Sequence, residues 1–105
     1  MAGKLTGVEI IAAERKRHTE VEGWTAEHDD QHSAGEIAMA AVVYAMPPKE
    51  RDNEILRQNF AELLWPWEWH WFKPSKRKTV SGRIRELAKA GALMAAEIDR
   101  LQRTR

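Results

Sequence analysis

The stretch "EIAMAAVVYAM", residues 36–46, constrains the fold most strongly, because it is apolar on almost every side. A helix of that kind is buried in a protein core. Pro47 and Pro48 follow directly, and proline ends a helix because it lacks an N–H and clashes with the preceding turn. Residues 33–36, "SAGE", have the spacing of a capping box, which marks a helix start. We therefore expect a central buried helix that starts after Ser33 and stops before Pro47.

Three further helices are predicted. Thr6 and Glu9 form a capping box for a first helix that runs to about Val21 and ends at Gly23. The segment "ERDNEILRQNFAELLW" has helical apolar spacing and predicts a third helix between the prolines at 48 and 66. A last helix over residues 83–101 carries one apolar stripe, in steps of three and four, with a flank of small residues where another helix can approach. The stripe consists of Ile84, Leu87, Gly91, Met94, Ile98 and Leu101.

These patterns predict an all-α fold of about four helices in a single domain, residues 1–105. Charged residues make up 31% and apolar residues 43%, as in folded proteins, and the absence of cysteine excludes disulfides and thiolate metal sites. The N-terminus lacks a signal-peptide pattern, and no apolar run reaches membrane-spanning length. We therefore expect a protein of the cytoplasm with no membrane contact.

The small net charge of +1 hides an asymmetry between the two halves of the chain. Residues 1–50 carry five basic and nine acidic side chains, whereas residues 51–105 carry twelve and seven. The basic excess is sharpest over residues 73–89. Such a distribution suits two solvated faces, head-to-tail association or an anionic ligand.

Four tryptophans alternate in "WPWEWHWFKP", residues 65–74, between the third and last predicted helices. In an extended segment the four rings point to one side, whereas a short helical turn would fan them out. They are predicted either to pack the core or, beside the basic "KPSKRK", to form a platform on which a nucleobase stacks.

The stretch "EGWTAEHDDQHSAGE", residues 22–36, gathers carboxylates and imidazoles without any lysine or arginine. In a helix, His28, His32 and Glu36 would share one face at i, i+4 and i+8, which makes them, with Asp29, candidate ligands of zinc or another divalent ion. Asp29 and Asp30 could also hold Mg²⁺ for a nucleotide. Capping and solvation explain the carboxylates equally well, since acids are favoured near a helix N-terminus.

The motifs EGWT-x-EHDD-x-H-x-x-GE, Trp-Pro-Trp followed by Lys-Pro, and AGAL-x-x-AEI-x-RL cover residues 14–102. They resemble a group of small phage- and prophage-encoded proteins. This resemblance implies a viral protein that works in the host cytoplasm, and it implies no activity.

Two fainter similarities concern function. "GWTAEHDDQH" before an alanine-rich helix is similar to MazG-type all-α nucleotide pyrophosphohydrolases, which hold magnesium with carboxylate pairs on adjacent helices, but the second ExxE pair is missing here. "GWTAEHDD" and "PPKERDNEIL" also resemble parts of the ryanodine-receptor repeat domain, whose Tyr-Gly and His-Pro elements are absent.

Together these features favour a phage-type, homo-oligomeric protein that binds a nucleotide-like molecule without turnover, as in sequestration of a host defence signal. Trp67 and Trp71 are predicted to stack on the base, and His28 and Asp30, beside Trp24, to bond base or ribose edges. Phosphate would be neutralised by Arg15, Arg17, Lys73, Lys76 and Arg77.

Two alternatives remain open from sequence. One is a magnesium-dependent pyrophosphohydrolase that uses Glu27, Asp29, Asp30 and Glu36. The other is an inhibitor that binds a host defence enzyme through the acidic stretch.

Overall fold

The computed structural model describes residues 4–104, and within that range the chain is all-α, without strands, as predicted. Two further helical turns are a wide π-helical turn, η1 (Arg57–Ala61), and a tight 3-10 turn, η2 (Trp69–Trp71). The helices are α1 (Gly7–Glu20), α2 (Ala26–Asp30), α3 (Glu36–Ala45), α4 (Pro48–Arg51), α5 (Glu54–Leu56), α6 (Glu62–Leu64) and α7 (Val80–Gln102).

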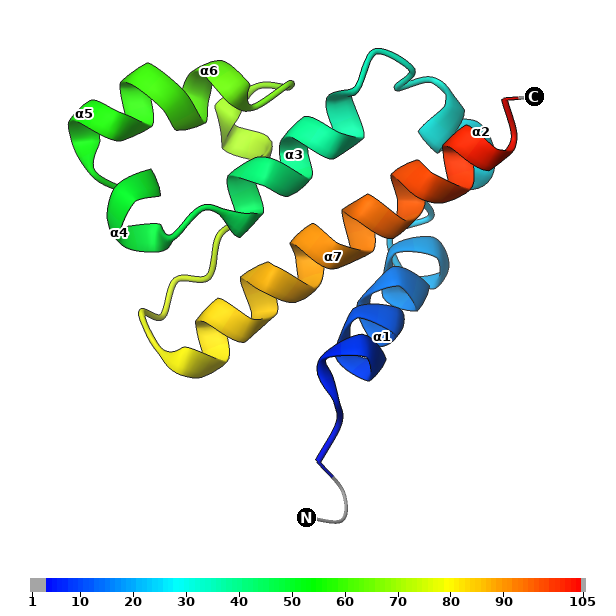
Figure 1. Cartoon of the computed structure of the whole chain (residues 1–105), viewed down its shortest axis with the longest axis horizontal. Helices are drawn as coiled ribbons and strands as arrows, with labels where there is room; N and C mark the ends of the chain where they lie inside the picture. The colour runs from blue at the N-terminus through cyan, green and yellow to red at the C-terminus, as the bar shows by residue number, and fades with distance from the viewer. Residues whose placement is uncertain (1–3, 105) are drawn as a thin grey trace.

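The long helix α7 lies between α1 and α3 and packs against both (Figure 1). Its contact with α3 forms the core, where small side chains such as Ala40, Ala41 and Ala90 are almost fully buried and bring the two helices close together. Val43 and Leu93 fill the space around them. The prediction that residues 36–46 form a buried helix is confirmed, and so is its end before Pro47.

The apolar stripe of the last helix is not part of this core. Ile84, Leu87, Met94, Ile98 and Leu101 are each between 44% and 57% exposed. The buried side of α7 is instead the alanine-rich side, because small side chains allow the close helix approach that these contacts need. Gly91 serves the same purpose: a β-carbon there would lie 2.6 Å from Cδ1 of Ile11 in α1.

The start of α1 matches its prediction. The Thr6 hydroxyl accepts a hydrogen bond from the Glu9 N–H, and Glu9 in turn accepts one from the Thr6 N–H, which completes the capping box. Val8, in the first turn of α1, is 79% exposed. The buried residues of α1 are Glu14 and His18, so this helix packs through polar groups as well as through Ile11.

The second predicted capping box, at Ser33 and Glu36, is wrong. The residue that precedes α3 is Gly35, which has φ +88° and offers no side-chain cap. Glu36 still accepts a hydrogen bond in this turn, but from the Ala34 N–H at 2.6 Å. A glycine that adopts the left-handed region turns the chain more sharply than a serine cap allows. The turn separates α3 from the short helix α2, which carries His28.

The predicted third helix is broken into α4, α5, η1 and α6. The break lies at Asn53, whose side chain accepts hydrogen bonds from the N–H groups of Ile55 and Leu56 and therefore caps a new helix. Beyond α6, the tryptophan segment is extended apart from η2. Trp65 is 6% exposed and Trp71 is 61% exposed, so the rings fan out instead of sharing one side.

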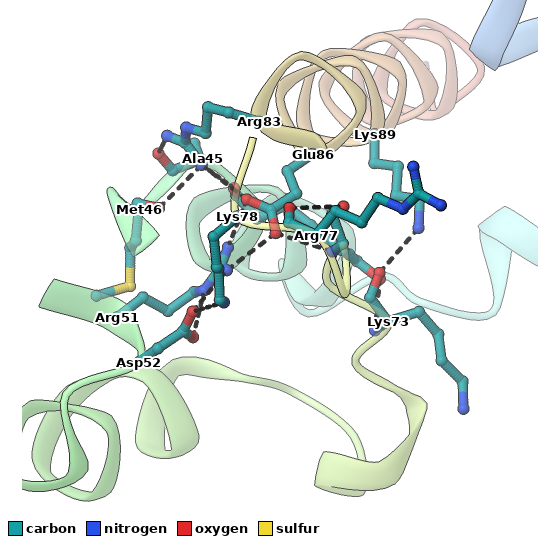
Figure 2. Close-up of polar contacts among 12 residues, drawn as sticks. Ala45, Met46, Arg51, Asp52, Lys73, Arg77, Lys78, Arg83, Glu86 and Lys89 are labelled. Carbon is teal, nitrogen blue, oxygen red and sulfur yellow. Dashed lines mark hydrogen bonds and ion pairs between the residues drawn. The ribbon is translucent and has the colours of Figure 1, made fainter. Parts of the chain in front are cut away.

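A buried ion pair ties α4 to α7 (Figure 2). Arg51 is fully buried, and its guanidinium donates to both carboxylate oxygens of Glu86, at 3.0 and 3.3 Å. Glu86 also accepts a hydrogen bond from the Ser75 N–H. Arg83 donates to the last carbonyls of α3, those of Tyr44, Ala45 and Met46. These contacts position the tryptophan segment from its C-terminal side.

Candidate functional site

An open cleft of about 810 Å³ lies between α2, α3 and the tryptophan segment. This volume is in the range of pockets that hold small organic ligands. Aromatic rings and histidines form most of its wall, with two carboxylates and a few apolar groups. The lining residues are Trp24, His28, Asp29, His32, Ile37, Tyr44, Trp65, Pro66, Trp67, Glu68, Trp71 and Leu93.

A continuous row of rings runs along the cleft from Trp24 to Trp67. The rings of Trp24 and His28 are stacked, with an interplanar angle of 7° and centroids 5.9 Å apart. His28 meets His32 edge to face at 5.2 Å, and His32 meets Trp67 in the same way at 5.2 Å. Edge-to-face and stacked contacts are favourable aromatic geometries, so the rings hold one another in place.

Trp65 forms the fixed base of this row. Its ring packs edge to face on Tyr44 and Phe72, and its indole N–H donates to the Glu68 carbonyl at 3.1 Å. The Tyr44 hydroxyl accepts a hydrogen bond from the Lys73 N–H at 3.0 Å, which ties the segment to α3. The cleft is therefore built on a rigid core, with the exposed ring of Trp71 at its edge.

Asp29 determines which nitrogen of His28 is available. It is 4% exposed, and its Oδ1 lies 3.1 Å from His28 Nδ1. In a neutral imidazole this contact places the proton on Nδ1, so that Nε2 keeps a lone pair and acts as a hydrogen-bond acceptor. The second carboxylate oxygen of Asp29 is buried without a hydrogen bond, and its nearest cation is Arg15 at 3.8 Å. His28 is thus an oriented acceptor in the wall of the cleft.

A buried pair in α1 supports Trp24 from behind. His18 Nε2 lies 2.9 Å from Glu14 Oε2, and the imidazole of His18 packs on the Trp24 ring at 4.5 Å. Burial raises the pKa of Glu14, but hydrogen bonding from Arg17 and the charges of His18 and Arg85 outweigh this and hold the pKa at about 2. Burial lowers the pKa of His18 by more than the charge of Glu14 raises it.

Acid should therefore destabilise the fold through Glu14. Because its folded pKa of about 2 lies below the usual value of 4.5 for a glutamate, its stabilising contribution is complete above about pH 4.5 and is lost as the pH falls toward 2. We expect urea unfolding to lose about 2 kcal/mol over this interval from this group, after allowance for screening of its exposed partners. Glu14→Gln should flatten that part of the pH profile, whereas Glu20→Gln on the exposed side of α1 should not. Equal profiles for wild type and Glu14→Gln would contradict the assignment.

The structure brings together the aromatic and imidazole residues predicted for the site, but not the cations. Trp24, His28, His32, Trp67 and Trp71 all line the cleft. No lysine or arginine is among the lining residues of the described chain. The predicted phosphate ligands Lys73, Lys76 and Arg77 belong to the segment before α7, outside the cleft wall, and the predicted residue Asp30 pairs with Arg103 at 2.9 Å.

The two predicted arginines of α1 are engaged by carboxylates. Arg15 lies 3.2 Å from Asp99 and also approaches Asp29 from behind the cleft. Arg17 pairs with Glu14 at 2.9 Å. Their charge therefore serves to hold α1 and its neighbours in place.

The four candidate metal ligands do not converge. His28 is paired with Asp29, and His32 Nδ1 lies 3.7 Å from a carboxylate oxygen of Glu36. Among residues 4–104, no group of three or more histidine or carboxylate side chains is arranged to hold a metal ion. The residues therefore do not fit the divalent-metal site that the sequence pattern suggested.

Several lining residues were not predicted, among them Tyr44, Trp65, Glu68 and Leu93. Tyr44 and Leu93 sit in helices whose apolar pattern indicates only burial, and no local signal shows that their buried sides end at a cleft. Trp65 belongs to the predicted tryptophan run, and its alternation with Trp67 was the available signal.

The chain matches no protein-family model, no curated protein and no solved structure. No helix in the described part of the chain combines the length and apolar character that a membrane crossing requires.

Proposed function

We propose that the cleft binds the base of a nucleotide-like molecule, preferably a purine with an exocyclic amino group, and releases it unchanged. The observation that supports this most is the row of rings from Trp24 to Trp67 with the oriented acceptor of His28 within it. Aromatic side chains bind nucleobases by stacking, at about 1–3 kcal/mol per base. A hydrogen-bond acceptor beside the stack favours bases that offer an N–H.

Recognition of the base, and not of phosphate, follows from the charges of the cleft. Its ionisable lining consists of Asp29, Glu68 and two histidines, without lysine or arginine among the described residues. Phosphate recognition commonly relies on arginine or lysine side chains. The basic segment over residues 73–78 lies outside the wall and is not part of the proposal. A phage protein that sequesters a host nucleotide signal could recognise it through its base alone.

The separate pairing of the acidic residues supports binding over catalysis. Asp29 is paired with His28, Asp30 with Arg103 and Glu36 with the turn before α3. A pyrophosphohydrolase needs carboxylates that share a metal and the substrate phosphates. An inhibitor of a host protein remains the alternative, supported by the exposed ring of Trp71 at the edge of the cleft, since exposed tryptophans often anchor protein interfaces.

Adenosine and purine riboside provide the sharpest test, because they differ only at C6: an amino group in one and a hydrogen atom, with no N–H on that edge, in the other. One additional hydrogen bond to His28 should favour adenosine by roughly fivefold in calorimetric titration. Asp29→Asn should reduce this preference, because an amide no longer specifies which ring nitrogen of His28 carries the proton.

Asp30→Asn is the matched control, since the neighbouring carboxylate pairs with Arg103 outside the cleft and should leave the preference unchanged. Equal affinity for the two nucleosides, or equal effects of the two variants, would contradict the assigned role of His28.

If no nucleoside binds and a host enzyme does, the inhibitor alternative is correct. Chromatography of adenosine triphosphate recovered after incubation with Mg²⁺ should show no product, and hydrolysis would overturn the proposal of binding without turnover.

A further inference from the structure

The wall of the binding cleft carries negative charge. Its carboxylates are Asp29 and Glu68, and neither lysine nor arginine lines the cleft within the described chain. Asp29 is 4% exposed, and one of its oxygens has no hydrogen bond. The arginine that approaches it, Arg15, lies 3.8 Å away and is closer to Asp99, at 3.2 Å, so one positive charge faces two carboxylates. The buried charge of Asp29 is therefore incompletely compensated, which favours a positively charged ligand beside it.

The aromatic rings of the cleft favour the same kind of ligand. Four tryptophans and Tyr44 line it, and the face of an aromatic ring attracts a cation, most strongly in tryptophan. The chain already contains such a contact: Lys89 Nζ lies 5.5 Å from the centroid of the Tyr44 ring and donates to the Lys73 carbonyl. Lys89 is not part of the cleft wall, and the exposed ring of Trp71 at the edge of the cleft can accept a cation in the same way.

His28 determines where the positive charge of the ligand should lie. Its Nδ1 contacts Oδ1 of Asp29 at 3.1 Å, which leaves Nε2 as the acceptor. The carboxylate polarises the imidazole and makes Nε2 a better acceptor, because hydrogen bonds in a chain strengthen one another. An N–H that itself carries positive charge forms the stronger, charge-assisted bond. The most favourable base therefore carries its charge at the amino group that meets His28.

We infer that the cleft prefers a purine with a fixed positive charge, one that is alkylated on the ring nitrogen beside its amino group. This inference rests on the proposed function, because it names the class of base that the same cleft binds. Alkylation at N1 of adenine spreads a positive charge over N1 and the amino group at neutral pH. Such a base combines the stacking of a neutral purine with attraction to the rings and to the two carboxylates of the wall.

Two isomeric nucleosides, 1-methyladenosine and N6-methyladenosine, test the preference. Each has one added methyl group and keeps an exocyclic N–H, but only the first is a cation at neutral pH. In calorimetric titration we expect 1-methyladenosine to bind about tenfold more tightly than its isomer, and more tightly than adenosine. Equal affinities of the two isomers, or tighter binding of N6-methyladenosine, would overturn the inference.

Adenosine in the same series separates this inference from the proposed function. If adenosine binds and 1-methyladenosine binds no more tightly than its isomer, base recognition stands and the preference for charge fails. If 1-methyladenosine binds and adenosine does not, the preference for charge stands and recognition of neutral bases fails. Binding of none of the three nucleosides overturns both.

The double variant Asp29→Asn with Glu68→Gln removes both charges of the wall and should reduce the preference to about threefold or less. Asp30→Asn with Glu62→Gln is the matched control, because it removes two carboxylates that do not line the cleft, and it should keep the full preference. Circular dichroism checks that both variants remain helical. Glu68→Gln alone should also lower the preference, and because this side chain is 81% exposed, the substitution leaves the fold intact if the change at Asp29 does not. An unchanged preference in these folded variants, or an equal loss in the control, would overturn the inference.

Discussion

Replacing Glu86 by alanine should lower the free energy of unfolding by about 3–5 kcal/mol, the usual cost of removing one partner from a buried ion pair. Without Glu86, the fully buried Arg51 keeps only Asp52 as a carboxylate partner in the described part of the chain, and because Glu86 is 2% exposed, water cannot replace the lost contacts. The substitution also removes the acceptor of the Ser75 N–H, which holds the segment before α7. Urea unfolding followed by circular dichroism measures the change.

Two controls separate the pair from a general effect of losing a glutamate. Glu62→Ala removes an exposed pair with Arg57 on α6 and should change stability by less than about 1 kcal/mol. The double variant Arg51→Met with Glu86→Leu replaces both charges by apolar groups, and it should recover much of the loss because no buried charge remains unpaired. If Glu86→Ala costs no more than Glu62→Ala, the pair does not hold α4 to α7.

The second large effect concerns Trp67. Its ring ends the aromatic row and faces the cleft beside His32. If a base stacks there, Trp67→Leu should weaken adenosine binding by about 1–3 kcal/mol, or roughly 5- to 150-fold, while the half-buried position keeps the loss of stability moderate. Calorimetric titration of the two proteins measures the difference.

Trp69 provides the matched control, because it lies in the same segment but packs on Phe72 and does not line the cleft. Trp69→Leu should lower stability without weakening binding by the folded protein. An equal loss of affinity in both variants would show that the segment matters only as a packed unit. Full affinity in Trp67→Leu would place the ligand elsewhere.

Local patterns were sufficient for the helical class and for several boundaries. Thr6 with Glu9 starts α1 as predicted, and the two prolines end α3, since each signal acts through atoms within one helical turn. The predicted helix start at Ser33 was wrong, because the left-handed conformation of Gly35 turns the chain just before α3. Whether the serine or the glycine precedes the helix depends on how α2 packs. Asn53 interrupted the third helix by capping a new one in the middle of a helical apolar pattern.

The stripe on α7 shows the limit of periodicity as a predictor. The pattern correctly identified an apolar row, but it does not specify which helix covers that row. Within one chain, α3 packs instead on the alanine-rich side, where the two backbones come closer. The stripe is half-exposed for that reason.

The binding cleft was also predicted only in part, because a local pattern shows which residues are unusual but not which residues they contact in the folded chain. Residues 22–36 were recognised as unusual from their carboxylates and imidazoles, and Trp24, His28 and His32 do line the cleft. The pairing of Glu14 with His18 behind Trp24 depends on tertiary packing, as does the pairing of Asp30 with Arg103. The predicted cation set failed because neither the charge excess over residues 73–89 nor the two arginines of α1 face the cleft.

Proton–nitrogen NMR of the tryptophan side chains, with adenosine as the ligand, tests the central claim most directly. The chain has five tryptophans, and four of them, Trp24, Trp65, Trp67 and Trp71, line the cleft, whereas Trp69 does not. We predict that saturating adenosine shifts the indole N–H signals of Trp24 and Trp67 most and leaves that of Trp69 unchanged. Unchanged signals for Trp24 and Trp67, or a dominant shift of Trp69, would contradict base recognition in this cleft.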